Sequence, residues 1–193
     1  ILTSLLIFIS SCGNERTEEI NPAFVGFISG FTSGMVSNET TIKINLAEPA
    51  QNVQYDEPID DDLFDFNPNI DGEAFWVDEN TIEFRPEERL PSGTHFKAEF
   101  DLSEILEVPS DLKTFYFDFE TIKQGVKVEF AGVRPYDNNS LEWQQITFEL
   151  ITADYANLET LEEVISATQN GNKLKTTWDH SAGNKVHYFT VDS

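Results

Sequence analysis

Residues 72–100, with the sequence GEAFWVDENTIEFRPEERLPSGTHFKAEF, decide the fold of this chain. Apolar and polar residues alternate in the segments EAFWV, TIEF and HFKAEF, and the turn-forming segments DEN and RPEERLPSG separate them. Because successive side chains of a strand point to opposite faces, Ile82 and Phe84 share one face, and so do Phe96 and Phe100. The pattern predicts a three-stranded meander of a β-sandwich, with one buried face and one solvated face.

The length of the chain indicates more than one such unit. With 193 residues it is too long for one immunoglobulin-sized sandwich of about 100 residues. We expect an all-β protein with two tandem immunoglobulin-like β-sandwich modules, over residues 23–122 and 123–193. The second module shows a hairpin signal at Asn170-Gly171 and a further turn at 181–184, which makes roughly five strands, so we expect it to be an incomplete sandwich.

The charge of the chain limits its partners. Asp and Glu number 35 against 12 Lys and Arg, which gives a formal net charge of −23 at pH 7. A field of this sign repels phosphate groups, so nucleic acid and anionic lipid headgroups are not expected as partners. The 16 Phe and three Trp residues supply enough apolar material for packed cores, which argues against a disordered acidic tail.

The N-terminal segment is typical of an exported lipoprotein. The nine apolar residues 1–9 are too few for a membrane span but suit the apolar region of a signal peptide. Small residues precede the single cysteine, Cys12, so we interpret residues 1–12 as part of a lipoprotein signal segment in which Cys12 is acylated; an ordinary signal peptide is the alternative. The polar residues 13–22 then form a flexible tether. Such a chain would be anchored in the outer membrane of a bacterial cell envelope, on its periplasmic or its surface face.

Histidine and acidic residues offer two places where a metal could bind, and neither pattern is specific. The acidic segment 56–65 lacks the regular spacing of a calcium loop, so a solvated loop is the simpler interpretation. His180 and His187 flank the turn at 181–184, and pairing 178 with 187 and 180 with 185 would place both on the Trp178 face as a surface pair. No third ligand lies nearby in the sequence, and we predict neither a metal site nor a cofactor.

No constellation in the sequence indicates catalysis. Acidic residues are too numerous to single out a glycosidase pair, and no glycine loop precedes a helix in the manner of a phosphate site. We therefore expect no enzymatic activity and name no catalytic residue. Trp76 and Trp143 lie within strand patterns, where an exposed indole could stack on a sugar ring, although burial in a core is the more common fate of such residues.

Two segments of the first module carry a resemblance to a known family. Residues 27–49 (FISGFTSGMVSNETTIKINLAEP) and 63–102 (LFDFNPNIDGEAFWVDENTIEFRPEERLPSGTHFKAEFDL) resemble the immunoglobulin-like module that opens lipid-anchored bacterial alpha-2-macroglobulin-like proteins. Residues 161–191 look like the second N-terminal domain of those inhibitors. The residues of the first module that carry the pattern are Phe66, Pro68, Gly72, Trp76, Asp78, Thr81, Phe84, Pro86, Leu90, Gly93 and Thr94.

The resemblance implies a role as N-terminal scaffold or spacer modules of a membrane-anchored, broad-spectrum protease inhibitor. In that family a cleavable bait region traps proteases, and many members carry a thioester. The thioester motif Cys-x-Glu-Gln is absent here and no bait region is recognisable, so only the anchor Cys12 carries over. The implied partners are the membrane, downstream domains of the same chain and, for the full-length protein, proteases. The alternative is an immunoglobulin-like surface adhesin or a glycan-binding lipoprotein.

Overall fold

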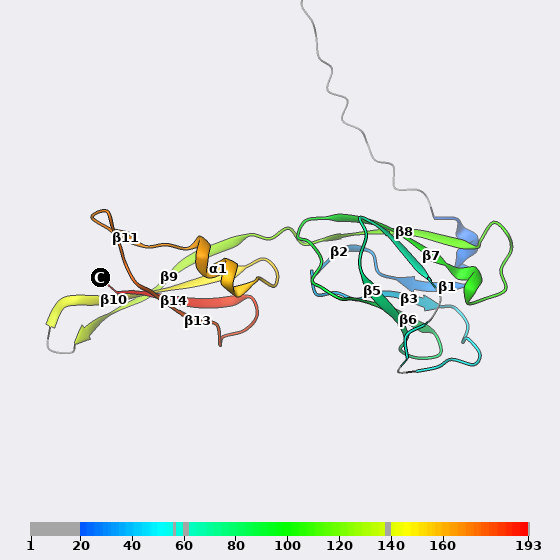
Figure 1. Ribbon diagram of the computed structural model, residues 1–193, viewed down its shortest axis with the longest axis horizontal. Coiled ribbons are helices and arrows are strands. Elements are labelled where there is room, and N and C mark those ends of the chain that lie inside the picture. Colours follow the sequence, from blue (N-terminus) through cyan, green and yellow to red (C-terminus); the bar gives the residue numbers. More distant parts are fainter. Residues whose placement is uncertain (1–19, 56, 60–61, 138–139, 193) are drawn as a thin grey trace, which may run out of the picture.

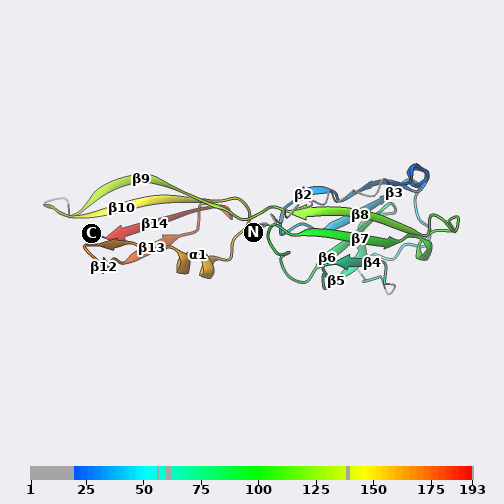
Figure 2. The same cartoon turned by 90° about the horizontal axis from the view of Figure 1, so that it is seen from above.

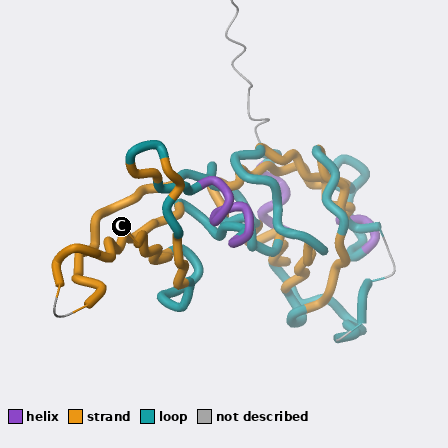
Figure 3. The backbone as a smooth tube through the Cα atoms, turned by 60° about the vertical axis from the view of Figure 1, so that its left-hand side comes forward, coloured by secondary structure: helices purple, strands orange, loops and turns teal. Residues whose placement is uncertain are grey.

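The computed structural model describes residues 20–192 except 56, 60, 61, 138 and 139. Two β-rich bodies lie end to end along the longest axis (Figure 1), and the view from above shows the same elongated arrangement (Figure 2). Helices are few and short beside the strands (Figure 3). The expectation of an all-β protein is confirmed.

The first body is a sandwich of two four-stranded sheets. The first sheet has the order β1-β3-β6-β5 and the second the order β2-β8-β7-β4. Their strands are β1 (Ile28–Phe31), β2 (Gly34–Val36), β3 (Ile42–Leu46), β4 (Phe64–Asn67), β5 (Gly72–Trp76), β6 (Thr81–Pro86), β7 (His95–Asp101) and β8 (Thr114–Thr121). The 3-10 helix η1 (Pro22–Gly26) precedes β1, and the 3-10 helix η2 (Leu102–Glu104) lies between β7 and β8.

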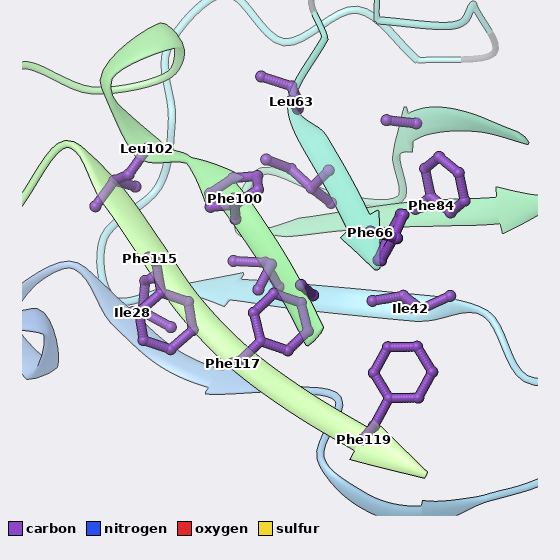
Figure 4. Close-up of a cluster of buried hydrophobic side chains, with 14 of the residues drawn as sticks. Ile28, Ile42, Leu63, Phe66, Phe84, Phe100, Leu102, Phe115, Phe117 and Phe119 are labelled. Carbon is purple, nitrogen blue, oxygen red and sulfur yellow. The ribbon is translucent and has the colours of Figure 1, made fainter. Parts of the chain in front are cut away.

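Alternating side chains build the core between these two sheets. In β7, every second residue from Phe96 to Phe100 is buried while the residues between them are exposed, as the sequence pattern predicts. Aromatic rings from both sheets meet in the centre (Figure 4). Phe66 of β4, for example, packs against Phe84 of β6 with ring centroids 4.8 Å apart. This burial of phenylalanine is the main driving force for folding of the first body.

The predicted three-stranded meander is wrong at its second connection. β5 and β6 pair antiparallel, but β7 lies in the other sheet, where it pairs with β4 and β8. The long turn between β6 and β7, which includes Gly93 at φ 62°, therefore carries the chain from one layer of the sandwich to the other. Residues 34–36 form the short strand β2, which runs parallel to β8.

The second body is one antiparallel sheet covered in part by a helix and a small hairpin. The sheet has the order β13-β14-β10-β9, and the hairpin pairs β11 with β12. The elements are β9 (Val126–Asp137), β10 (Ser140–Thr152), α1 (Leu158–Val164), β11 (Thr168–Gln169), β12 (Asn172–Lys173), β13 (Thr176–Asp179) and β14 (Val186–Asp192). Among the residues whose burial is described, its core is small and consists of Leu150, Leu161, Phe189 and Val191.

The two turns predicted in this body have different outcomes. Asn170 and Gly171 both adopt positive φ, 52° and 82°, in the β11–β12 hairpin, so this turn is confirmed. The turn between β13 and β14 is longer than expected, because β13 ends at Asp179 and β14 begins at Val186. Trp178 therefore pairs with Phe189 and not with residue 187.

We predict that Phe96→Ala strongly destabilises the first body. The Phe96 ring is fully buried and stacks on Phe119 with centroids 5.1 Å apart. Its removal leaves a cavity, and the expected loss in the free energy of unfolding is about 3–5 kcal/mol in denaturant titrations. Tyr116→Ala, at a side chain that is 51% exposed on the outer face of the same sheet, serves as the control and should cost about 0.5 kcal/mol or less. Equal losses for the two variants would contradict this account of the core.

Candidate functional site: the junction and the histidine cluster

Two buried polar groups of the described chain stand out, and each lies in a network of its own. The Asp154 side chain is 1% exposed and lies where the two bodies meet. His187 is fully buried in the second body. Burying such groups is unfavourable unless partners replace the lost water, so the partners show what each network does.

Asp154, just after β10, is a carboxylate bound from both bodies. The hydroxyl of Ser37 donates to its Oδ1 at 2.8 Å, and the backbone N–H of Asn38 donates to its Oδ2 at 2.6 Å. From the second body, Lys185 Nζ lies 2.9 Å from Oδ1. The side-chain amide of Asn38 donates in turn to the carbonyl of Tyr155 at 3.0 Å. One buried charge thus joins the β2–β3 connection to the end of β10.

Gln124, in the link between the bodies, adds a second set of bonds to the same place. Its Nε2 donates to the carbonyls of Asp154 and Tyr155 at 2.9 and 3.1 Å, and its Oε1 accepts from the backbone N–H of Asp154 at 3.0 Å. Its own N–H donates to Ser92 Oγ at 2.6 Å, in the first body. The linking segment is therefore held on both sides and is not a free hinge.

The Tyr155 ring lies between two cations at the same junction. Lys185 Nζ is 5.0 Å from its centroid, and the Arg89 guanidinium, from the first body, is 5.9 Å away. Arg89 also donates to the carbonyl of Ala156 at 3.2 Å. Cation–π contacts of this kind contribute about 0.5–1 kcal/mol at exposed positions. Their contribution to the stability of the junction is therefore smaller than that of the buried carboxylate.

The hydrogen bonds keep Asp154 ionised. Burial by itself raises the pKa of the Asp154 carboxyl, but the bonds from Asn38, Lys185 and Ser37 outweigh it, and the pKa lies below its ordinary value of 3.8. A carboxyl whose pKa is lowered by folding stabilises the native state above pH 3.8, and this contribution is lost as the pH falls through the lower native pKa.

The second network is a chain of three side chains in the second body. His187 Nδ1 of β14 lies 3.0 Å from Nδ1 of His180, and His180 Nε2 lies 3.0 Å from Oε1 of Glu162 on α1. The His180 ring also stacks on Trp178 with centroids 5.5 Å apart. The chain therefore connects the buried strand β14 to the helix that covers the sheet.

The partners assign the protons of this chain. A carboxylate only accepts hydrogen bonds, so when both rings are neutral His180 Nε2 carries the proton toward Glu162, and His180 Nδ1 accepts from His187 Nδ1–H. His187 Nε2 is left as a bare acceptor without a partner among the described residues. Burial, followed by the neighbouring His180, lowers the pKa of His187 below its ordinary value of 6.5.

The histidine prediction from the sequence needs correction. The two rings do approach each other, but His187 is buried and not on the surface, because it lies on the face of β14 that also carries the buried Phe189 and Val191. A third potential ligand, Glu162, comes from α1. Its proximity to His180 is not evident in the sequence, because the two residues are far apart along the chain. Among the residues that the structure describes, no group of three or more His, Cys, Asp or Glu is placed to hold a metal ion. Glu162 and His187 contact different nitrogens of the His180 ring, Nε2 and Nδ1 respectively.

The other candidate residues are placed as follows. Cys12 lies outside the described residues, and so does the side chain of Trp143 in β10. Trp76 in β5 is partly buried and packs against the core of the first body. Asp56, Asp60 and Asp61 of the acidic segment are also outside the described residues. No described helix is long and apolar enough to cross a membrane.

Comparison with known proteins identifies no family. No protein-family model matches the chain, and no curated protein matches it. Among solved structures, L,D-transpeptidase 3 from Mycobacterium tuberculosis with a faropenem-derived adduct has a TM-score of 0.35 and 14% identity over 53% of this chain and 40% of that chain. A second structure of L,D-transpeptidase 3 has a TM-score of 0.35 and 11% identity, and covers 81% of this chain and 59% of that chain.

An L,D-transpeptidase from Mycobacterium tuberculosis H37Rv gives the same TM-score of 0.35, with 12% identity over 81% of this chain and 60% of that chain. This chain thus spans between 40% and 60% of the length of these structures. Likeness at this level carries no argument about activity, and the fold is assigned from the strand pairing alone.

We predict that Asp154→Asn weakens the junction. The amide is neutral, so Lys185 loses its counter-charge in a partly buried place, and the amide NH2 faces donors where an oxygen accepted before. The expected loss in the free energy of unfolding is about 2 kcal/mol at neutral pH, and it should shrink below pH 3.8 as the native protein loses the same interaction. Glu88→Gln, at an exposed acid of the first body, is the charge-matched control. A neutral effect of Asp154→Asn would contradict this account of the junction.

A second prediction concerns pH and the second body. Because folding lowers the pKa of His187, the unfolded chain takes up a proton near pH 6.5 that the native state does not, and stability falls as the pH drops below that value. The protection factors of the β14 amides, which correct for slower intrinsic exchange at lower pH, should therefore fall between pH 6.5 and 5. His187→Leu should flatten this dependence, whereas His95→Gln, at an exposed histidine of the first body, should leave it unchanged.

Proposed function

We propose that the two bodies form a rigid spacer that holds its two ends at a fixed distance and orientation to each other. The observation that carries this proposal is the junction, where the buried Asp154 carboxylate is bound by Ser37 and Asn38 of one body and Lys185 of the other. A flexible linker needs no such charge. A spacer does, because it transmits orientation only if the bodies cannot rotate against each other.

The shape and chemistry of the described chain are compatible with this role. The bodies lie end to end and not side by side, which gives the greatest length for the number of residues (Figure 1). At the junction, the Asp154 carboxylate and the Gln124 side chain are bound within the protein itself, whereas Oδ1 of Asn38 has no partner among the described residues. A net charge of −23 also favours solubility of an exposed, extended module.

For the parent protein we propose a lipid-anchored, alpha-2-macroglobulin-like protease inhibitor of the bacterial envelope, with Cys12 as the anchor and these modules at its base. The support is the residue pattern of the first module, its position after a lipoprotein-like cysteine and the β-rich module that follows. The bait and trap would lie downstream. The adhesin or glycan-binding alternative gains no support from Trp76, because its side chain is partly buried and packs against the core.

Rigidity is tested by the distance between spin labels at Lys97 in β7 and Thr177 in β13, both exposed, in a Cys12→Ser background. We predict one narrow distance distribution for the native junction, and a clearly broader distribution after Asp154→Ala, since the charge that joins the bodies is gone. Glu88→Gln is the control and should keep the narrow distribution. A broad distribution in the native protein would refute the spacer.

The identity of the parent is tested separately. An antibody against residues 23–122 should detect, in the membrane fraction of native cells, a polypeptide several-fold heavier than this chain that incorporates methylamine, the reagent that opens thioesters. A band near 21.9 kDa without incorporation would contradict the inhibitor proposal and leave the spacer result intact.

A further inference from the structure

The inner face of the sheet β13-β14-β10-β9 is apolar across its whole width. Trp178, Phe189, Phe148 and Phe130 form one cross-strand row, one residue from each strand. Their ring centroids are 4.9, 5.1 and 6.2 Å apart in that order. Rows of this kind normally mark the buried side of a sheet.

Only part of this face is covered. Leu161 of α1, with the segment that leads to β12, packs over the part of the face formed by β13, β14 and β10. The β9 half carries four large apolar side chains that are about half exposed or more: Val126 54%, Val128 45%, Phe130 65% and Val133 54%. Contiguous apolar residues on a surface usually mark a contact with another molecule.

β9 is also an edge strand. Its one strand partner in the described part of the chain is β10, so its other edge presents unpaired backbone groups. Natural edges are usually blunted, and β9 is blunted only in its second half. An extra residue, Ala131, interrupts its register with β10, and Pro135 follows. Residues 126–130 remain a regular, open edge.

The charged residues of this open edge are complementary to those of a second copy of the same edge. Lys127 and Glu129 lie on the face opposite Val126, Val128 and Phe130, and pair with each other at close range. If a second β9 runs antiparallel with the two-fold axis at Val128, Lys127 of each copy lies opposite Glu129 of the other, and Val126 lies opposite Phe130. An axis at Lys127 or at Glu129 would place identical charges opposite each other, and an axis between two residues would place apolar side chains opposite charged ones.

We propose that residues 126–130 of β9 form a contact between two copies of this chain, by antiparallel strand pairing about a two-fold axis at Val128. The contact continues the sheet across both copies and places Phe130 of one copy beside Val126 of the other. The paired strands are short, so the dimer is weak. The contact is independent of the anchor and of the spacer role.

The net charge of the chain opposes this association, and it makes the strength of the dimer depend on salt in a characteristic way. Two chains of net charge −23 repel each other at long range, whereas the Lys127–Glu129 pairs act locally. We expect added salt to strengthen the dimer, because screening reduces the long-range repulsion more than it affects strand pairing and apolar contact.

The test is a charge swap read by sedimentation of the whole chain over a concentration series. Lys127→Glu places Glu opposite Glu, and Glu129→Lys places Lys opposite Lys, so each single variant should weaken dimerisation about ten-fold. The double variant K127E/E129K restores opposite charges across the axis and should restore the dimer. Lys173→Glu in β12 changes the net charge as Lys127→Glu does, away from β9, and controls for long-range repulsion.

Three results would overturn the proposal. They are a monomer at every concentration and salt level, a dimer that neither single swap weakens beyond the control, and a double variant that stays as weak as the singles. The second would assign the association to a different surface, and the third to a different register of pairing at β9.

Discussion

A single buried carboxylate, Asp154, is bound from both bodies of this protein and joins them. Asp154 is almost fully removed from water and ionised, and such a group is tolerated only with close partners. Because those partners come from both bodies, separating the bodies would leave a charge without compensation. Gln124 satisfies the surrounding backbone groups, so the link between the sandwich and the second sheet is a fixed part of the structure.

The two bodies differ in how they are stabilised. The first has a large aromatic core between two four-stranded sheets. Among its described residues, the second has four buried apolar side chains in its core, a histidine chain that connects α1 to β14, and an apolar face that is partly exposed. The second body therefore depends more on specific polar contacts, and it is the part in which pH and partner strands have the larger effect.

The sequence predicted what depends on local pattern and not what depends on packing at a distance. Period-two alternation located β6 and β7, and Asn170-Gly171 located a hairpin, because backbone geometry at those positions is set by a few neighbouring residues. The same alternation does not say which sheet a strand joins, so the crossing between β6 and β7 was missed. It also does not fix the length of a turn without a strong signal, which is why the register at His187 was wrong by two residues.

Asp154 could not be found from the sequence for the same reason. It is one of 35 acidic residues, and it follows a strand in the ordinary segment TADYANLE. Nothing local distinguishes it from a solvated turn residue, and its partners Ser37 and Asn38 are more than 110 positions away. The polar network of the junction exists only once the strands are placed.

Hydrogen exchange at one backbone amide tests this account most directly. The Asn38 N–H lies in the connection between β2 and β3, donates to Asp154 and would be exposed if the bodies moved apart. We predict that it is protected as strongly as the amides of the adjoining strand β3 at neutral pH. Exchange at the rate of an unstructured loop would mean that the junction opens freely and that the two bodies are not one rigid unit.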